Sequence, residues 1–543
     1  MKNIQVPAIL LAVLAIAFLS SCRKAETTTE PYRLTVDMAR LDRPAGTYYS
    51  LPCTERSLEL DFSEAIDSAT LPGAISIAGP EKLADSLFSV SCYGRKVFIA
   101  FHSGFILKEG WQYLLTVTTA LRSVTGSALK ATTVLELRTT TLHPGLGGQE
   151  RNSIVCISDI HMGDPRASAK GYAWFGENAA ALDSLLTMVR QSPRVRQLVI
   201  LGDLFDGWVI PYRINPLDPA AGISSVDDYF RAVAASPVNA GIIASLQAIA
   251  AGGVTQLIYV PGNHDMLLTP ELLQELIPGI LRAGDAPGLG HYTPSPGIIM
   301  EHGHRYDFFN APQPLAIPGH ILPPGFFVSR LDAQGLMDKG KHPGSLKEAN
   351  GSAEFLTAWT AAITYLEVSY SMTVAPDSAN ILTGGMDGFA GPLSFNGIRD
   401  QYAAAIETAW PETQVVNNVP VAMPAFMAIV NGSSDMGAAA DYEYILPGVP
   451  TPCSVVVFGH THQAMIRQYP STADPAGIYA NTGTWVNREL TSHPVRTFVE
   501  VIPGAWSGSA LDVVSVYQYN RAATGDDYEP ALLEQASVKT PHR

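Results

Sequence analysis

The first third of the chain shows the pattern of a small all-β domain. Between Arg33 and Thr141, short runs of alternating apolar and polar residues are separated by turns, as in 58–62 and 97–101. Alternation with a period of two predicts strands with one buried face. Several such strands at short spacing predict a small β-sandwich. We therefore assign 33–143 to one all-β domain.

After the Pro/Gly-rich segment 143–148 the pattern changes to alternating strands and helices. A helical repeat of apolar residues begins after Asn178, and another follows Ser236 and closes at Gly252-Gly253. Apolar strands of four residues flank these helices at 154–157, 198–201 and 257–260. This β-α-β-α-β order predicts a layered α/β domain, with β-sheets flanked by helices and ligands at the carboxyl ends of the strands. We place this domain at 150–520 and predict a polar tail at 521–543.

The N-terminus carries a targeting segment. Lys2 precedes an apolar run from Val6 to Leu19, which is too short to span a bilayer comfortably. The sequence Leu-Ser-Ser-Cys that ends at Cys22 resembles the lipobox of bacterial lipoproteins, in which the cysteine becomes the lipidated first residue. We therefore predict a signal peptide at 1–22 and a polar tether at 23–32. The alternative is an ordinary signal peptide whose cleavage site lies near a cysteine.

Composition and charge narrow the possible partners. The 543 residues are 47% hydrophobic and carry a net charge of −15, so a basic face for binding phosphate backbones is not expected. Nucleic acid is therefore not expected as a partner. Of the remaining cysteines, Cys53 and Cys92 could form one disulfide in an oxidising envelope, whereas Cys156 and Cys453 lie in apolar runs and are expected to be buried thiols.

Five short polar segments follow predicted strands of the α/β domain. They read Asp-x-His, Gly-Asp-x-x-Asp, Gly-Asn-His-Asp, His-Gly-His and Gly-His-Thr-His, in that order. They lie at 159–161, 202–206, 262–265, 302–304 and 459–462, and their Asp, Asn and His side chains are possible metal ligands. Oxygen and imidazole ligands without thiolate suit Mn, Fe or Zn. Five strand ends that all carry Asp, Asn or His predict a metal site at this edge of the sheet.

Taken together, these segments resemble the calcineurin-like metallophosphoesterase superfamily over roughly 152–520. The resemblance implies two divalent metal ions, one held by Asp159, His161 and His462 and the other by Asn263, His302 and His460. Asp203 would bridge the two ions. It further implies hydrolysis of a phosphate ester or pyrophosphate by attack of a metal-bound hydroxide on phosphorus.

The same resemblance gives roles to residues beside the ligands. His264 would stabilise charge or protonate the leaving oxygen, and Asp265 would fix the tautomer of its imidazole. Asp206 is expected to support a ligand rather than to be one. His304 is either a substrate contact or an exposed loop histidine.

About 140 residues separate the last two motifs, and we interpret 311–450 as a cap insertion over the site. Helices are predicted near 353–368 and 395–410. The aromatic residues of the insertion form either a wall for the substrate or the small core of the cap itself. They include Trp359, Tyr365, Phe389 and Trp410.

The N-terminal strands resemble a bacterial Ig-like domain of the surface-protein type, which would act as a spacer or docking module. The whole sequence is then interpreted as an enzyme of the bacterial cell envelope, lipid-anchored to a membrane and periplasmic or surface-exposed. Its expected substrate is a phosphorylated small molecule or a lipid-linked phosphate. The alternative is a catalytically silent surface protein, binding or structural, that retains the fold.

Overall fold

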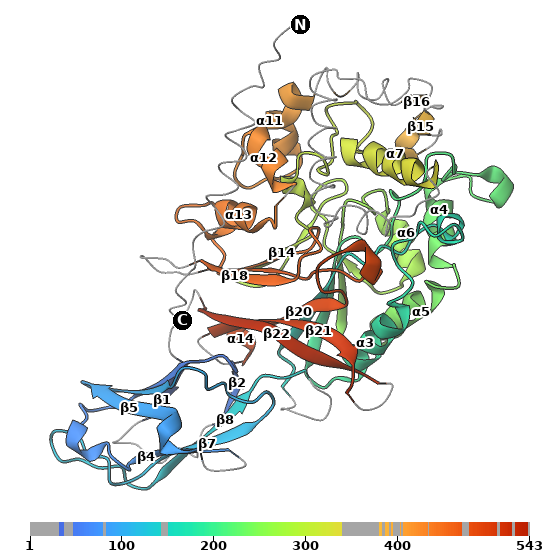
Figure 1. The fold of residues 1–543 in the computed structure, drawn as a ribbon. Coiled ribbons are helices and arrows are strands. Elements are labelled where there is room, and N and C mark those ends of the chain that lie inside the picture. Colours follow the sequence, from blue (N-terminus) through green and yellow to red (C-terminus); the bar gives the residue numbers. More distant parts are fainter. Residues whose placement is uncertain are drawn as a thin grey trace, which may run out of the picture.

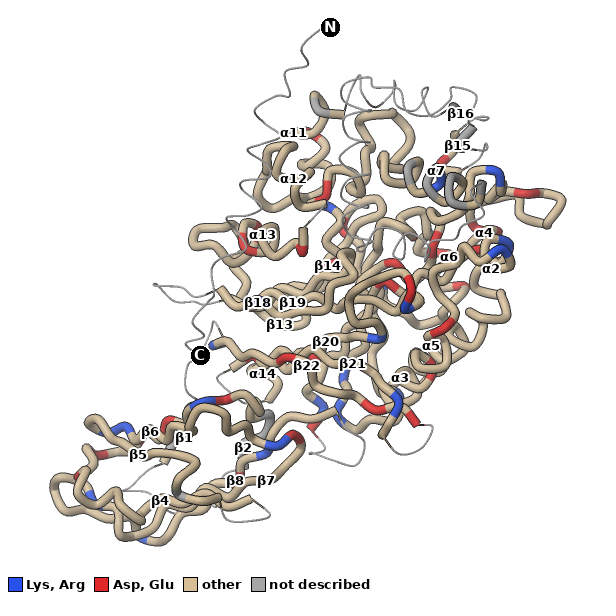
Figure 2. The backbone as a smooth tube through the Cα atoms, viewed as in Figure 1, with Lys and Arg blue, Asp and Glu red and all other residues tan. Residues whose placement is uncertain are grey.

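The structure is a computed structural model, shown as a ribbon in Figure 1. It describes residues 32–36, 47–79, 83–142, 150–338, 380–382, 386–389, 393–394, 402, 406–432, 434–469, 477–507, 511–523 and 527–540. The predicted signal peptide, with Cys22, and the tether up to residue 31 lie outside the described residues. Acidic and basic residues are scattered over the elements that the structure describes (Figure 2).

The N-terminal part consists of two four-stranded sheets. Their strand orders are β1-β3-β6-β5 and β2-β8-β7-β4. The strands are β1 (Tyr32–Thr35), β2 (Thr47–Leu51), β3 (Ser57–Asp61), β4 (Ile75–Ala78), β5 (Phe88–Tyr93), β6 (Lys96–Phe101), β7 (Gln112–Val117) and β8 (Thr133–Thr139). Alternate residues point inward, so Leu58 and Leu60 of β3 share one core with Leu115 and Val117 of β7. The period-two pattern thus does produce strands here, while the Ig-like assignment stays a prediction.

This β domain is joined to the C-terminal strands by buried polar contacts. The side chain of Gln535 accepts a hydrogen bond from the backbone N–H of Cys53 (2.7 Å) and donates one to Thr140 Oγ1 (2.8 Å). Leu511 contributes to the hydrophobic core of the N-terminal sheets. Figure 1 shows the blue N-terminal sheets beside the red C-terminal strands.

The described cysteines are all free thiols, so the disulfide considered for Cys53 and Cys92 is not formed. The Cys53 thiol lies at the border with the C-terminal strands and donates to Thr140 O, whereas the Cys92 thiol on β5 donates to Ile66 O. Each thiol therefore has its own backbone acceptor. Cys156 and Cys453 are buried thiols, as predicted.

The α/β part contains two stacked sheets. The seven-stranded sheet has the order β12-β11-β10-β9-β20-β21-β22, and the five-stranded sheet has the order β13-β14-β17-β19-β18. The first comprises β9 (Ser153–Ile157), β10 (Val195–Leu201), β11 (Gln256–Val260), β12 (Leu281–Arg282), β20 (Thr497–Ile502), β21 (Leu511–Arg521) and β22 (Tyr528–Lys539). The second comprises β13 (His291–Ser295), β14 (Ile298–Glu301), β17 (Val455–Phe458), β18 (Met465–Tyr469) and β19 (Gly477–Asn481).

Alternating residues of the buried strands face two different cores. On β9, Ile154 and Cys156 share a core with Met300 of the five-stranded sheet, whereas Val155 and Ile157 share one with the helices. A strand buried on both faces reads as a continuous apolar run, which is the pattern of 154–157. The two sheets therefore pack face to face, with helices outside the seven-stranded sheet.

Four helices of the α/β part share the core on the outer face of the seven-stranded sheet. They are α3 (Ala179–Gln191), α4 (Val226–Ala234), α5 (Ala240–Gly252) and α6 (Pro270–Leu276). The short helices α2 (Pro165–Ser168) and α14 (Gly504–Ser507) lie elsewhere, and Trp506 of α14 packs against the core between the two sheets. Helix α3 follows Asn178, as predicted, and α5 ends at Gly253 with a left-handed φ of 63°. Within the described residues, no helix has the length and apolar content needed to cross a membrane.

The described parts of the predicted cap form a layer of short elements above the five-stranded sheet (Figure 1). They are α7 (Pro324–Asp338), β15 (Asn380–Leu382), β16 (Leu393–Ser394), α11 (Ile406–Val416), α12 (Ala425–Asn431), α13 (Gly437–Ala440) and the π-helical turn η6 (Asp441–Ile445). The helix predicted at 353–368 lies outside the described residues. Of the one predicted at 395–410, residues 402 and 406–410 are described and helical, and α11 continues to Val416. Trp410 is buried and donates its indole N–H to Met423 O, so it belongs to the core of the cap rather than to a substrate wall.

The C-terminal boundary differs from the prediction of a polar tail at 521–543. Strand β22 lies in this range and pairs antiparallel with β21 from Leu511 to Arg521. Only Ala536 and Val538 of β22 bury apolar side chains in the sheet core, and the buried Gln535 faces the N-terminal domain. The strand was missed because it buries few apolar residues. The α/β part therefore extends to Lys539.

Candidate metal centre

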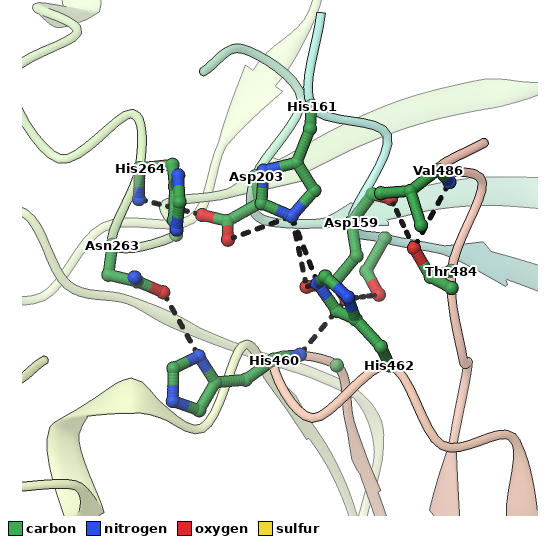
Figure 3. Close-up of polar contacts among 12 residues, drawn as sticks. Asp159, His161, Asp203, Asn263, His264, His460, His462, Thr484 and Val486 are labelled. Atoms are coloured by element: carbon green, nitrogen blue, oxygen red, sulfur yellow. Dashed lines mark hydrogen bonds and ion pairs between the residues drawn. The ribbon is translucent and has the colours of Figure 1, made fainter. Parts of the chain in front are cut away.

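The predicted ligands lie on loops that leave neighbouring strands. Strands β9, β10 and β11 run parallel, as do β14 and β17, and each ends directly before a polar motif. Carboxyl ends of parallel strands meet at one edge of a sheet. The structure brings the ligands from both sheets together there, and Figure 3 shows most of them around a common centre.

One set consists of Asp159, His161 and His462. The two Nε2 atoms of His161 and His462 lie 3.0 Å apart, and His462 Nε2 is 3.2 Å from Asp159 Oδ1. One ligand atom from each of the three residues lies within 4.8 Å of the others. Two imidazole nitrogens and a carboxylate oxygen therefore point at one small volume. This is the arrangement that a divalent cation needs.

A second set consists of Asn263, His302 and His460. The amide oxygen of Asn263 lies 2.9 Å from His302 Nε2 and 3.0 Å from His460 Nδ1. His302 Nδ1 donates to the backbone oxygen of Leu201 (2.7 Å), which leaves its Nε2 lone pair directed at the same volume. These three residues can hold a second cation.

Asp203 lies between the two sets. Its Oδ2 is 3.3 Å from His302 Nε2 and 3.7 Å from His161 Nε2, so one carboxylate oxygen faces both volumes. Its Oδ1 accepts a hydrogen bond from the backbone N–H of His264 (2.8 Å). The position of Asp203 therefore fits the bridging role that the sequence predicts.

The donor set has the charge balance of a cation site. Burial and the nearby His264 lower the pKa of His161 to about 3, so this imidazole is neutral, as a ligand must be. Burial disfavours a charged His302, but Asp203 and Asp159 outweigh it and raise the pKa of His302 to about 9. The buried Asp159 Oδ1 accepts no hydrogen bond. The carboxylates of Asp203 and Asp159 thus give the site negative charge. A bound cation would neutralise this charge in place of the proton on His302, so the residues fit divalent metals.

The backbone at the ligands is strained. Positive φ angles are uncommon for residues other than glycine and cost about 1–3 kcal/mol when they are sparsely populated. In the described residues, five candidate ligands adopt them: Asp159 (φ 53°), His161 (56°), Asp203 (52°), His460 (71°) and His462 (61°). Strain that clusters in this way is typical of functional sites.

Two glycines allow the loops of this edge to approach each other. A Cβ atom on Gly202, which has a φ of 77°, would lie 2.6 Å from Gly262 Cα. A Cβ atom on Gly262 would lie 2.2 Å from Asp203 Oδ1. Only glycine fits at either position, so the strand-end glycines serve contact between the ligand loops.

His264 lies beside the two sets and is held by Asp206. Its Nδ1 is 2.9 Å from Asp206 Oδ1, and the indole of Trp208 stacks on its ring with centroids 4.6 Å apart. Burial opposes a charged imidazole, but Asp203 and Asp206 outweigh it and raise the pKa of His264. Asp206 and Trp208 therefore fix the orientation of the His264 ring. The contact with Asp206 uses Nδ1 and not Nε2.

The role predicted for Asp265 is wrong. Its carboxylate accepts hydrogen bonds from the backbone N–H groups of Gly262 (2.9 Å), Leu204 (2.8 Å) and Phe205 (3.2 Å). Asp265 thus ties two ligand loops together, and Asp206 is the carboxylate on His264. Sequence adjacency misled the prediction, because neighbouring side chains on a tight loop point in different directions.

Of the two roles considered for His304, the exposed loop histidine is wrong, whereas a contact with substrate stays a prediction. The imidazole is buried, and its Nε2 lies 3.0 Å from the backbone oxygen of Gly288. Burial and the neighbouring His302 and His460 hold its pKa well below the ordinary value. His304 therefore packs behind the ligands as a neutral side chain.

Sequence reasoning missed two groups that contact the site residues. Trp208 stacks on His264, and the Asp307 carboxylate lies 3.0 Å from His460 Nε2. Trp208 lies two residues past the second aspartate of Gly-Asp-x-x-Asp, and Asp307 lies three residues past the His-Gly-His motif. Proximity to the motifs was the only signal for either residue.

Two similarities to known proteins each cover part of the chain. No curated protein matches the chain. Among solved structures, domains 1–6 of the surface layer protein SbsC match at 21% identity, over 18% of this chain and 14% of that one, with a TM-score of 0.14. The chain thus spans about a seventh of that structure, and so small a likeness supports no argument about fold or function.

The remaining finding concerns the α/β part. Residues 153–341 match the model of the calcineurin-like phosphoesterase family. The matched range contains Asp159, Asp203, Asn263 and His302, and it ends before His460. The mixed α/β sheets fit a metallophosphoesterase fold, and the family together with the clustered ligands supports metal-dependent phosphoesterase activity. The match over 153–341 therefore supports assignment of this region to the calcineurin-like phosphoesterase superfamily.

Proposed function

We propose that the protein is a hydrolase that uses two divalent metal ions to cleave a phosphate ester or pyrophosphate. One observation carries the proposal: Asp203 faces both ligand sets with a single carboxylate oxygen, 3.3 Å from His302 Nε2 and 3.7 Å from His161 Nε2. A carboxylate so placed serves a pair of cations better than a single one. Mn, Fe and Zn suit the oxygen and imidazole donors.

Bound metals would supply Lewis-acid chemistry, lowering the pKa of water and withdrawing charge from the phosphoryl oxygens. The chain itself supplies the proton. Asp206 accepts from Nδ1–H of His264 and favours the protonated ring, so Nε2–H can donate to the oxygen of the leaving group. Trp208 holds the ring in this orientation from one face.

The competing proposal is a surface protein that kept the fold and lost the chemistry. Loss of catalysis would be expected to remove a ligand, yet each motif position holds a residue able to bind a metal, and the structure places these residues together. We therefore favour the enzyme. Cleavage of monoesters, diesters and pyrophosphates would use the same ligands, so the metal centre does not choose between them.

We also propose that the enzyme is anchored in the bacterial cell envelope by lipid on Cys22, facing the periplasm or the exterior. The support is the sequence alone, an apolar run followed by Leu-Ser-Ser-Cys. A phosphorylated small molecule or lipid-linked phosphate would then be the substrate. If Cys22→Ala leaves the protein membrane-bound with undiminished acyl labelling, the anchor is wrong.

The activity can be tested on the full chain after metal removal and reconstitution with Mn, Fe or Zn. The substrates are aryl phosphate monoesters and diesters, nucleotide sugars and phospholipid head groups. We expect metal-dependent hydrolysis of at least one class and its loss in Asp203→Ala. The matched control is Asp183→Ala, which changes an exposed aspartate on α3. Two bound metals with no hydrolysis across the panel would favour the silent alternative.

A further inference from the structure

Asp307 is a buried carboxylate between the ligand loops and the predicted cap. It follows the short helical turn η4 (His304–Tyr306) after His302, and its side chain is inaccessible to solvent. The segment 311–450, which we interpret as the cap, begins four residues later. Burial of a carboxylate is costly unless its oxygens are hydrogen-bonded, so its partners indicate what it does.

One partner of Asp307 is a candidate metal ligand. Its Oδ2 lies 3.0 Å from His460 Nε2, while His460 Nδ1 lies 3.0 Å from the amide oxygen of Asn263. A carboxylate can only accept, so the proton of a neutral His460 sits on Nε2. The lone pair of Nδ1 then points toward the second metal volume. Asp307 thereby selects the tautomer and the ring orientation that His460 needs as a ligand.

The remaining partners of Asp307 fix the carboxylate itself. Its Oδ1 accepts from the backbone N–H of Phe309 (2.9 Å), and its Oδ2 accepts from the side-chain amide of Asn310. Every oxygen of the buried group is thus engaged. The carboxylate is held in one orientation before any metal is bound.

The cap helix α12 closes over the same carboxylate. The backbone N–H of Phe308 donates to Ala428 O (3.2 Å), which ties the Asp307 segment to α12. Gly432, directly after α12, comes so close that a Cβ atom there would lie 2.6 Å from Asp307 Oδ1. By contrast, His302 is held by Leu201 O of the core strand β10. A core strand therefore holds His302, whereas His460 is held by Asp307, which packs against the cap helix α12.

We propose that Asp307 is a positioning residue for the second metal, that it acts through His460, and that α12 keeps it in place. This inference rests on the proposed binuclear site. It gives the predicted cap a role at the metal centre beyond any contact with substrate. A change in the packing of α12 against Asp307 would alter occupancy of the second site and leave the first unchanged.

The experiment is a titration of the metal-free full chain with Mn²⁺, followed by calorimetry and by elemental analysis after dialysis. In the Asp307→Ala variant we expect the second Mn²⁺ to bind about 10–100-fold more weakly, the usual effect of removing a partner of a metal-ligating histidine. The first Mn²⁺, held by Asp159, His161 and His462, should bind as in the wild type. Asp183→Ala is the matched control, because it removes an exposed aspartate on α3, a helix that carries none of the candidate ligands.

Two more variants guard against simple misfolding. Asp307→Asn keeps the size of the side chain but replaces one acceptor oxygen with an NH₂ group. That group would face another donor, either the N–H of Phe309 or the side chains of Asn310 and His460, so the variant should weaken the second site as well. Gly432→Ala pushes on Asp307 from α12 and should weaken the second site alone. The melting temperature of each metal-free variant shows whether the fold is intact.

The outcomes separate this inference from the proposed function. If the wild type binds fewer than two Mn²⁺ ions, the binuclear proposal fails. If the wild type binds two and Asp307→Ala binds both equally tightly, Asp307 is not a positioning residue. If Asp183→Ala weakens the second site as much as Asp307→Ala, or if both sites weaken together with the melting temperature, Asp307 has a structural role only.

Discussion

His264 and Asp206 form a pair in which Nδ1 and Oδ1 lie 2.9 Å apart, although 58 residues separate them in the chain. The pair joins the loop after β10 to the loop after β11. Trp208, two residues after Asp206, stacks on the imidazole of His264. The loop after β10 therefore supplies both the carboxylate and the indole that hold His264. Removing either contact should change the proton chemistry without removing a metal ligand.

The first prediction concerns this pair. In His264→Ala, kcat should fall by roughly 10²–10⁴-fold while both metals remain bound, because the role proposed for this side chain is to donate a proton and not to bind a metal. Asp206→Ala should lower kcat less. It should also move the alkaline limb of the pH profile to lower pH, because the imidazolium loses its partner and gives up its proton more readily. Steady-state kinetics and metal analysis of both variants provide the measurement.

The substrate provides a control for His264. Nitrophenyl esters have good leaving groups and need little protonation, so the defect of His264→Ala should shrink for them relative to alkyl esters. An equal defect for both substrate classes, or loss of metal, would make His264 a structural residue.

The second prediction concerns Asp203. In Asp203→Ala the two ligand sets lose the oxygen that faces both of them, so two cations would lie close together without a shared anion. Metal content and activity should therefore fall together. Chelation followed by Mn²⁺ addition should restore activity in the wild type and not in the variant. Normal metal content in Asp203→Ala would contradict a bridging position.

Much of the framework of the site is predictable from sequence because it depends on local patterns. Strands 154–157, 198–201 and 257–260 are continuous apolar runs, and such runs end where buried parallel strands end. Polar residues directly after them must meet at one edge of the sheet. The structure does bring the seven predicted ligands together, and their binding of metal stays a prediction.

The missed features depend on tertiary contacts that no local pattern records. The partner of His264 is Asp206 rather than the adjacent Asp265, because neighbouring side chains on a tight loop point in different directions. Asp307 gains its role only when β17 places His460 beside it. Strand β22 escaped prediction since it buries Gln535 against another domain instead of an apolar face against the core.

The third prediction tests the close approach of the ligand loops. In Gly262→Ala the new methyl group would overlap Asp203 Oδ1 and Asp203 N, at 2.2 and 2.3 Å, and backbone cannot move aside cheaply. We expect a lower melting temperature and loss of metal binding. Gly241→Ala is the control, because its Cβ atom would meet open space on α5. That change should be neutral or stabilise the protein by up to about 1 kcal/mol. Equal behaviour of the two variants would contradict the steric argument.

The last prediction uses a titrating group in the cap, away from the ligands. Burial raises the pKa of Glu443 to about 8, against an ordinary value of 4.5, and the nearby Glu301 adds to the shift. Its Oε2 accepts from the backbone N–H of Val421 (2.8 Å), which lies between α11 and α12. Glu443 is therefore protonated in the folded protein over a range in which the unfolded chain has already lost the proton.

The sign follows from proton binding. Between pH 4.5 and about 8 the folded state binds more protons at Glu443 than the unfolded state does, so the free energy of unfolding falls as pH rises. The stabilisation is fully present below pH 4.5 and is lost by about pH 8. Glu443→Gln keeps the acceptor for Val421 N–H and removes the titration. The melting temperature of the metal-free wild type should therefore fall relative to that of Glu443→Gln between pH 5 and 8, as followed by thermal melts at constant ionic strength. Parallel curves for the two proteins over this range would show that Glu443 does not titrate as the buried geometry requires.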